Sequence, residues 1–572
     1  MEGSLGPSGE RSPLNTEKLL RTGVWVLFGA TLSIALFPRI WNVDIFWHMA
    51  AGDWILQFGQ LPSTDVFSAI TPERKWFPFQ WLYEVVVAVG EDLFGLGGLR
   101  LMTGIILAVS TFLLARVLKR EGYSPWAVLG LTALTWVLFG DRIRVRPHVI
   151  NFLFVVLYMG LLRKAPREID LKKDLMRLLP GIALWANFHA GGVLIFLVML
   201  GTIPGGASVN YLIRKKEGNG DDSKIVLKSW GLWCAAALTA ALMPNFVMGT
   251  LHVPHLLEDS QSLITEWNSS WSWVLLGLNH WQENGNLIPS MFIVGIVPWL
   301  SLGLSILTGF VQFQKPAEER KLMLGGLFLA LGVSLIGIRY GRFAWLCIIP
   351  IAHCLHCWAS PLQRWSKWAP ILAILLVGTI FQYQIQVIRN GVAPAIESTL
   401  SGHLDERRFP VQGAHFLATS GVKGSAWVLP NWGGYLLWAT DRNILVLSDG
   451  RGNYDGDTAA RLTHVYENRW KPEALNTTLE AYNAYSEIDI LVMLHPALPT
   501  GETLEGWTRV YPPNRGWIKE LGLPPQMETP QKEVIYVKNH RQDAISKALS
   551  TWTEVAERIQ SQGVGIPAPK GD

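Results

Sequence analysis

The sequence predicts an α-helical protein that crosses a membrane many times and ends in a small α/β domain outside the membrane. Of the 572 residues, 49% are hydrophobic and only 16% are charged, whereas a soluble domain carries about 25% charged residues. The chain also has 27 tryptophans, and tryptophan collects at membrane interfaces. The net charge of +4 comes from basic residues in short loops, so no nucleic-acid-binding face is expected.

Residues 1–22 form a polar N-terminal segment without a recognisable signal peptide, which we expect in the cytoplasm. Residues 23–385 are expected to form the transmembrane domain, with about 11 apolar runs long enough to cross about 30 Å of hydrocarbon. Every second loop is basic, and basic loops stay in the cytoplasm. The odd number of spans then places residues 386–572 outside the cell membrane.

Ionisable residues at the predicted span ends gather on the outer side of this topology. The clusters are Asp44 to Glu84, Asp141 to His148, Trp185 to His189, Thr265 to Asn268, and Arg339 to Arg342. Ionisable groups at membrane depth are usually paired or functional. We therefore expect a single cavity that opens outward.

The first outer loop, residues 41–95, carries the densest mixture of acids, histidine and tryptophan. Asp44 and His48 are four residues apart, about one helical turn, on a predicted amphipathic helix in the membrane interface. A carboxylate beside aromatic rings at the water boundary suits a general base, and the alternative for Asp44 is a helix cap. His48 is a further catalytic candidate, and Glu84 is either a second catalytic acid or a buried, paired carboxylate. Asp65 is either a substrate contact or a turn residue.

Arginines in the second outer cluster have the composition of a phosphate clamp, because guanidinium groups meet phosphate oxygens bidentately. The residues are Arg142, Arg144 and Arg146, with His148 beside them. The alternatives are binding of lipid headgroups or pairing with Asp141. The further substrate-binding candidates are Asn187, His189, Glu266, Arg339 and Arg342. A satisfied structural histidine is the alternative for His189, and pairing with an arginine is the alternative for Glu266.

Residues 386–572 change character, because short apolar β runs alternate with helical stretches, as in a small α/β domain. The runs are Ser425 to Leu429, Ile444 to Leu447, Ile488 to Val492 and Val534 to Val537. Glycine motifs follow two of these runs, with Trp432 and Tyr435 in the first motif and Asp449 and Arg451 in the second. They could bind the acceptor or a glycan, or they could be glycine turns that join strands.

Motifs along most of the chain resemble those of a widespread group of bacterial polytopic membrane proteins. The motifs are Asp44-x-x-Trp47-His48, Arg146-Pro147-His148, Trp185-x-Asn187-x-His189, Glu266-Trp267, Trp432-Gly-Gly-Tyr435 and Asp449-Gly-Arg451. That group in turn resembles the GT-C superfamily of glycosyltransferases, which use polyprenyl-phosphate sugars. The resemblance implies an active site at the outer face of a bacterial inner membrane. The implied partners are the lipid bilayer, a polyprenyl-phosphate-linked sugar donor and an unknown acceptor.

The resemblance also implies roles for particular residues. Asp44 would deprotonate the acceptor, and arginines such as Arg142, Arg144 or Arg342 would hold the donor phosphate. Many members of the superfamily place two adjacent acids after the first span, whereas this chain has one. We therefore expect no cofactor and no metal site, with a divalent ion as the alternative.

The sequence thus predicts a membrane glycosyltransferase that moves a sugar from a polyprenyl-phosphate carrier to a lipid, glycan or protein acceptor. One alternative is a transporter or flippase of a lipid-linked or anionic substrate, a class that often shows two similar halves. No such halves are visible in the sequence. The other alternative is a non-catalytic membrane scaffold whose outer domain binds a partner.

Overall fold

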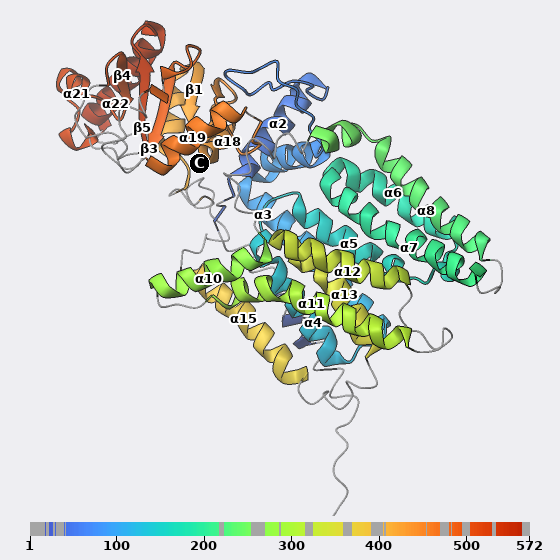
Figure 1. The fold of residues 1–572 in the computed structure, drawn as a ribbon. Coiled ribbons are helices and arrows are strands. Elements are labelled where there is room, and N and C mark those ends of the chain that lie inside the picture. The colour runs from blue at the N-terminus through green and yellow to red at the C-terminus, as the bar shows by residue number, and fades with distance from the viewer. Residues whose placement is uncertain are drawn as a thin grey trace, which may run out of the picture.

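The structure is a computed structural model in which a helical body and a smaller domain with a five-stranded sheet flank helix α2 (Asp44–Phe58) (Figure 1). It describes residues 39–562 apart from 41, 217–221, 253–268, 285–287, 315–323, 359–368, 390–403, 405–407, 454, 469–479, 482, 495–503 and 529–532, together with a few positions between 18 and 29. Within these residues the chain is mostly helical up to α15 and mixed α/β after it.

The helical body is built from helices that pack around one large apolar core. They are α3 (Trp81–Arg120), α4 (Pro125–Phe139), α5 (His148–Leu162), α6 (Leu171–Phe188), α7 (Ala190–Lys216), α8 (Ser223–Ala241), α10 (Ser270–Asn284), α11 (Pro289–Phe313), α12 (Leu324–Arg339), α13 (Ile348–Cys357) and α15 (Ala369–Arg389). Short 3₁₀ segments, η1 (Gly140–Arg142) and η6 (Gly341–Cys347), precede α5 and α13.

Three helices of the described chain, α3, α7 and α11, are long and apolar enough to cross a membrane. A fourth span results if α8 and the segment 246–252, which meet at 85°, are counted as one. The other apolar helices are shorter, among them α4, α5 and α12. The expected number of about 11 spans is therefore not reproduced by helix length. The reason is that several predicted spans form helices such as α4 and α5, which have only 15 residues each, whereas a straight span needs about 20 residues.

Helix α2 differs from the predicted amphipathic helix of the membrane interface, and that prediction was wrong. Eight consecutive residues, Ile45–Gly52, are all buried, so no polar face exists over this stretch. The reason is that α2 has protein on several sides, packing against α3 and against α18 (Pro430–Ala439) of the C-terminal domain. Gly52 permits the close approach of α3, since a Cβ there would lie 2.1 Å from the carbonyl oxygen of Glu84.

The sheet of the C-terminal domain has the strand order β2-β1-β3-β5-β4. The strands are β1 (Gly424–Val428), β2 (Ile444–Val446), β3 (Ile490–Leu494), β4 (Trp507–Tyr511) and β5 (Glu533–Lys538). β1 pairs in parallel with β2 and β3, whereas β5 is antiparallel to β3 and β4. The accompanying helices are α17 (Val411–Ser420), α18, α19 (Gly456–Asn468), α21 (Arg515–Leu521) and α22 (Gln542–Gln562). The α/β prediction is confirmed for this part of the chain.

The first loop and the C-terminal domain fold together. Ser68 forms a parallel bridge with Val446 of the edge strand β2, and Ala69 N donates to Val446 O at 2.9 Å. Phe46 and Phe67 belong to the same apolar core as the strands of the sheet. The loop that carries Asp44 is therefore held by the C-terminal domain as well as by α3.

Candidate active site

Asp44 begins helix α2 and is ion-paired with Arg146, which lies just before α5. Asn42 organises the pair, because its Oδ1 accepts from Arg146 Nε at 2.8 Å and from the Asp44 N–H at 3.4 Å. The Asn42 amide in turn donates to Val145 O at 3.0 Å. The Asp44 side chain keeps 19% of its surface exposed. This carboxylate is thus oriented by its neighbours and still accessible.

His48 and Glu84 form a second pair, one turn further along α2, with His48 Nδ1 3.5 Å from Glu84 Oε1. Both side chains are almost completely buried, and the His48 ring meets the Tyr83 ring edge-on. Burial, then the positive charge of Arg146 and the proximity of His189, hold the pKa of His48 well below its ordinary value. His48 is therefore a neutral imidazole at pH 7 that resists protonation, and it carries no charge to hold an anion.

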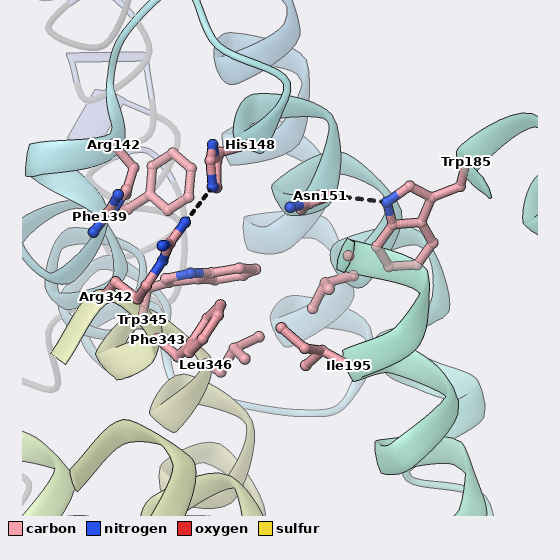
Figure 2. A pocket seen from close by; sticks show the side chains of 12 residues that line it. Phe139, Arg142, His148, Asn151, Trp185, Ile195, Arg342, Phe343, Trp345 and Leu346 are labelled. Carbon is pink, nitrogen blue, oxygen red and sulfur yellow. Dashed lines mark hydrogen bonds between the residues drawn. The ribbon is translucent and has the colours of Figure 1, made fainter. Parts of the chain in front are cut away.

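Figure 2 shows a cationic cluster where the end of α4 and the starts of α5 and η6 meet. Arg342 Nη2 lies 2.8 Å from His148 Nε2, and Arg142 lines the same small cavity and is 3% exposed. The cavity holds only about 20 Å³, roughly the space for one water molecule. A phosphate group could bind at its mouth or by displacing side chains.

Asn187 and His189 lie near this cluster, and their polar atoms are engaged by the protein. The Asn187 amide donates to Ala183 O at 2.8 Å and accepts from Trp81 Nε1 at 2.7 Å, which favours a structural role. His189 Nδ1 accepts the Gly192 N–H at 2.9 Å. The His189 ring lies 4.9 Å from the His148 ring, so His189 borders the cationic cluster.

Asp65, Asp449 and Arg451 form a buried ionic cluster that joins the first loop to the C-terminal domain. Arg451 contacts Asp65 at 2.8 Å and Asp449 at 2.6 Å, and all three side chains are at most 5% exposed. The guanidinium also lies over the rings of Trp76 and Phe67, at 4.6 and 4.9 Å. Burial acts to lower the pKa of Arg451, but the two carboxylates raise it above its ordinary value, so the charge is kept. These contacts favour the structural alternative over substrate binding.

The remaining predicted residues are packed in the C-terminal domain or lie at helix ends. Trp432 is buried, and Tyr435 packs between Phe46 and Phe409 at ring distances of 4.8 and 5.3 Å. Arg339 is exposed at the end of α12, and Arg144 is half-buried in the turn before α5. Glu266 lies outside the described residues.

A larger cleft runs between α2, α3 and the C-terminal domain, with a volume of about 750 Å³. It is lined by Asp53, Glu91, Asp92 and Asp441, together with aromatic groups such as Trp438. Burial, and next the nearby Asp92, raise the pKa of Asp53 to about 6.

Two residues at Asp44 were missed by the sequence prediction. Asn42 carries a weak signal, because it is a polar residue two positions before Asp44 at a span end. Gly450 lies within the Asp449-Gly-Arg451 motif, and a Cβ at this position would lie 2.6 Å from Asp44 Oδ1. Among the described residues, no three or more His, Cys, Asp or Glu side chains are placed to hold a metal ion.

The comparisons with known proteins concern the fold. No protein-family model matches the chain, and no curated protein matches it. Among solved structures, the apo form of the oligosaccharyltransferase from Archaeoglobus fulgidus is similar, with a TM-score of 0.50 at 9% sequence identity. The match covers 84% of this chain and 70% of that one. Over the matched part, this chain therefore shares the fold of that oligosaccharyltransferase.

Proposed function

We propose that this protein is a GT-C-type glycosyltransferase, which moves a sugar from a polyprenyl-phosphate carrier to an acceptor at the outer face of the membrane. The observation that carries the proposal is the accessible Asp44 carboxylate, ion-paired with Arg146. The Arg342–His148 contact, also at the start of α5, supplies further positive charge. The fold thus brings the candidate base and the arginines together, although they lie far apart in the sequence.

In the proposed reaction, Asp44 accepts the proton of the acceptor nucleophile. The nucleophile forms a new bond to the anomeric carbon of the sugar, and the bond from that carbon to the phosphate oxygen breaks. The polyprenyl phosphate leaves with the electron pair of that bond. Negative charge therefore grows on the phosphate as the reaction proceeds, and fixed cations stabilise this charge.

Arg146 and Arg342 are the proposed phosphate-binding residues, with Arg142 behind them. Planar guanidinium groups suit this task because they offer paired N–H donors to phosphate oxygens. Arg146 would play two roles, orienting Asp44 in the free enzyme and sharing its charge with the leaving phosphate. His48 and Glu84, which are buried beside Asp44, would shape the surroundings of its carboxylate.

The membrane arrangement belongs to the same proposal. About 11 spans, some of them formed by shorter or broken helices, would place the N-terminus in the cytoplasm. The C-terminal domain would then lie outside a bacterial inner membrane, next to the donor lipid and the unknown acceptor. The proposed reaction uses side chains alone and involves no cofactor.

Mass spectrometry of lipid-linked sugars and envelope glycans tests the proposal in wild-type, deletion and Asp44→Asn strains. We expect one sugar-sized mass to disappear from one acceptor in both mutants, while a donor lipid accumulates. Asp457→Asn is the control, because this carboxylate is 70% exposed on α19 and its loss should leave the glycans unchanged. Normal glycans in the Asp44→Asn strain, with the protein present at its usual level, would contradict the proposal.

A further inference from the structure

Part of the C-terminal domain packs directly against the candidate base. Two of its glycines face the start of α2: a Cβ on Gly434 would lie 3.1 Å from Trp47 N, and one on Gly450 would lie 2.6 Å from Asp44 Oδ1. The Gly450 Cβ would also lie 3.2 Å from Trp47 Nε1. A separation under 3.0 Å cannot hold a real side chain, so the Asp44 carboxylate occupies the space that the missing Cβ leaves.

The segment around Gly450 is fixed to the first loop. Gly450 lies between Asp449 and Arg451, and both flanking side chains belong to the buried ionic cluster with Asp65. The Arg451 N–H also donates to Asp449 Oδ1 at 2.9 Å, which closes the turn around Gly450. Because Asp65 is part of the first loop, the ionic cluster fixes the position of Gly450 relative to Asp44.

We propose that Gly450 is a positioning residue, which sets the location of the Asp44 carboxylate, and that the outer domain thereby completes the active site. The inference rests on the proposed function, because it takes Asp44 as the base. It differs from the expectation that this motif binds an acceptor or glycan. In this account the motif contacts the base and leaves the substrates to other residues.

The kind of atom that a new side chain would meet makes the inference testable. At Gly450 the nearest obstacle, at 2.6 Å, is the end of the Asp44 side chain, which can rotate away, whereas the Trp47 ring at 3.2 Å needs to move by only a few tenths of an ångström. At Gly433 the obstacle is backbone, because a Cβ would lie 2.0 Å from Ser448 O. Gly450 also has no left-handed backbone conformation, so alanine there adds no backbone strain. Gly450→Ala should therefore displace the carboxylate without unfolding the protein, whereas Gly433→Ala should destabilise it.

The experiment measures sugar transfer and thermal stability of the purified full-length protein, with the donor lipid that accumulates in the deletion strain. Gly450→Ala should lower kcat by roughly 100-fold, the loss typical of a misplacement by about 1 Å. The KM for the donor and the melting temperature should stay at wild-type values. Gly160→Ala is the matched control, because this α5 glycine is exposed with no atom within 4 Å of a new Cβ, and it should keep full activity.

A double-mutant cycle with Asp44→Ala separates positioning from a general structural role. If Gly450 acts through Asp44, Gly450→Ala should cause no further loss of activity once the carboxylate is gone. If Gly450→Ala does lower the melting temperature, removal of the Asp44 carboxylate should restore it.

Three results would overturn the inference: full activity of Gly450→Ala, a further loss in the Asp44→Ala background, or a lowered melting temperature that Asp44→Ala does not restore. Loss of transfer in Asp44→Asn together with an active Gly450→Ala would refute the positioning role and leave the proposed function intact. Full transfer by Asp44→Asn would instead refute the proposed function, and the positioning role with it.

Discussion

Replacing Arg451 with alanine should release the first loop from the outer domain. The guanidinium is 5% exposed and contacts two buried carboxylates, Asp65 and Asp449. Removing one partner of a buried ion pair typically costs about 3–5 kcal/mol, because the other partner is left buried without its counter-charge. The lost contacts with the Trp76 and Phe67 rings act in the same direction, and each such contact contributes about 0.5–2 kcal/mol. We take about 3–5 kcal/mol as the expected loss, since these contributions overlap.

Tryptic cleavage after Lys75 measures this loss without requiring the whole membrane protein to unfold. Lys75 is exposed, and its backbone forms an antiparallel bridge with Thr64 in the described loop. When opening and closing are fast, the cleavage rate follows the population of the open loop. A loss of at least 3 kcal/mol therefore predicts cleavage roughly 100-fold faster in Arg451→Ala than in the wild type.

Arg461→Ala is the matched control in the same domain. Arg461 pairs with Asp457 on the surface of α19, where the side chains are 38% and 70% exposed. An exposed pair of this kind contributes about 0–1 kcal/mol, so cleavage after Lys75 should stay close to the wild-type rate. Equal cleavage rates in Arg451→Ala and Arg461→Ala would refute the reasoning that the buried ionic cluster holds the loop.

Two further predictions concern helix α2. Gly52→Ala should destabilise the contact between α2 and α3 by about 1–3 kcal/mol, as in other overpacked sites. Its melting temperature in detergent should then fall below that of the control Gly160→Ala, and equal values would contradict the close approach. Asp53, whose pKa is raised to about 6 from 3.8 by burial and Asp92, binds its proton more tightly in the folded protein than in the unfolded one. Its contribution to stability therefore falls as the pH rises from about 4 to about 6 and stays low above that range. Asp53→Asn should raise the melting temperature at pH 7.5 more than at pH 4, and an equal effect at both pH values would contradict the assignment.

The sequence predicted the β1, β2, β3 and β5 strands well, because continuous apolar runs bounded by turn residues are a local signal. It missed β4, Trp507–Tyr511, where Thr and Arg interrupt the apolar pattern. The helical membrane part and the α/β tail follow from composition and patterning. The number of spans does not follow so directly, because an apolar run does not reveal whether a break divides it into shorter helices.

The candidate site shows the same division between local and distant signals. The positions of Asp44 and Arg146 at predicted span ends led to the expectation that both lie on one side of the membrane, and the structure pairs them. The contact between Arg451 and Asp65 could not be predicted, because Asp65 lies in the first loop and the contact forms only when the C-terminal domain packs there. A glycine such as Gly450 gives no signal of its own for the carboxylate beside it. Contacts of this kind depend on tertiary packing, which a single sequence does not encode in any short pattern.

The most direct test of the central claim uses purified protein in proteoliposomes, supplied with a lipid extract from the deletion strain. This extract should contain both the accumulated donor and, if the acceptor is a lipid, the unmodified acceptor; membranes of that strain supply any other acceptor. Wild-type protein should convert the donor to free polyprenyl phosphate and add one sugar mass to one acceptor, whereas Asp44→Asn protein should do neither. Equal transfer by the Asp44→Asn protein would contradict the assignment of Asp44 as the base. Movement of the intact donor across the bilayer without transfer would instead identify a flippase.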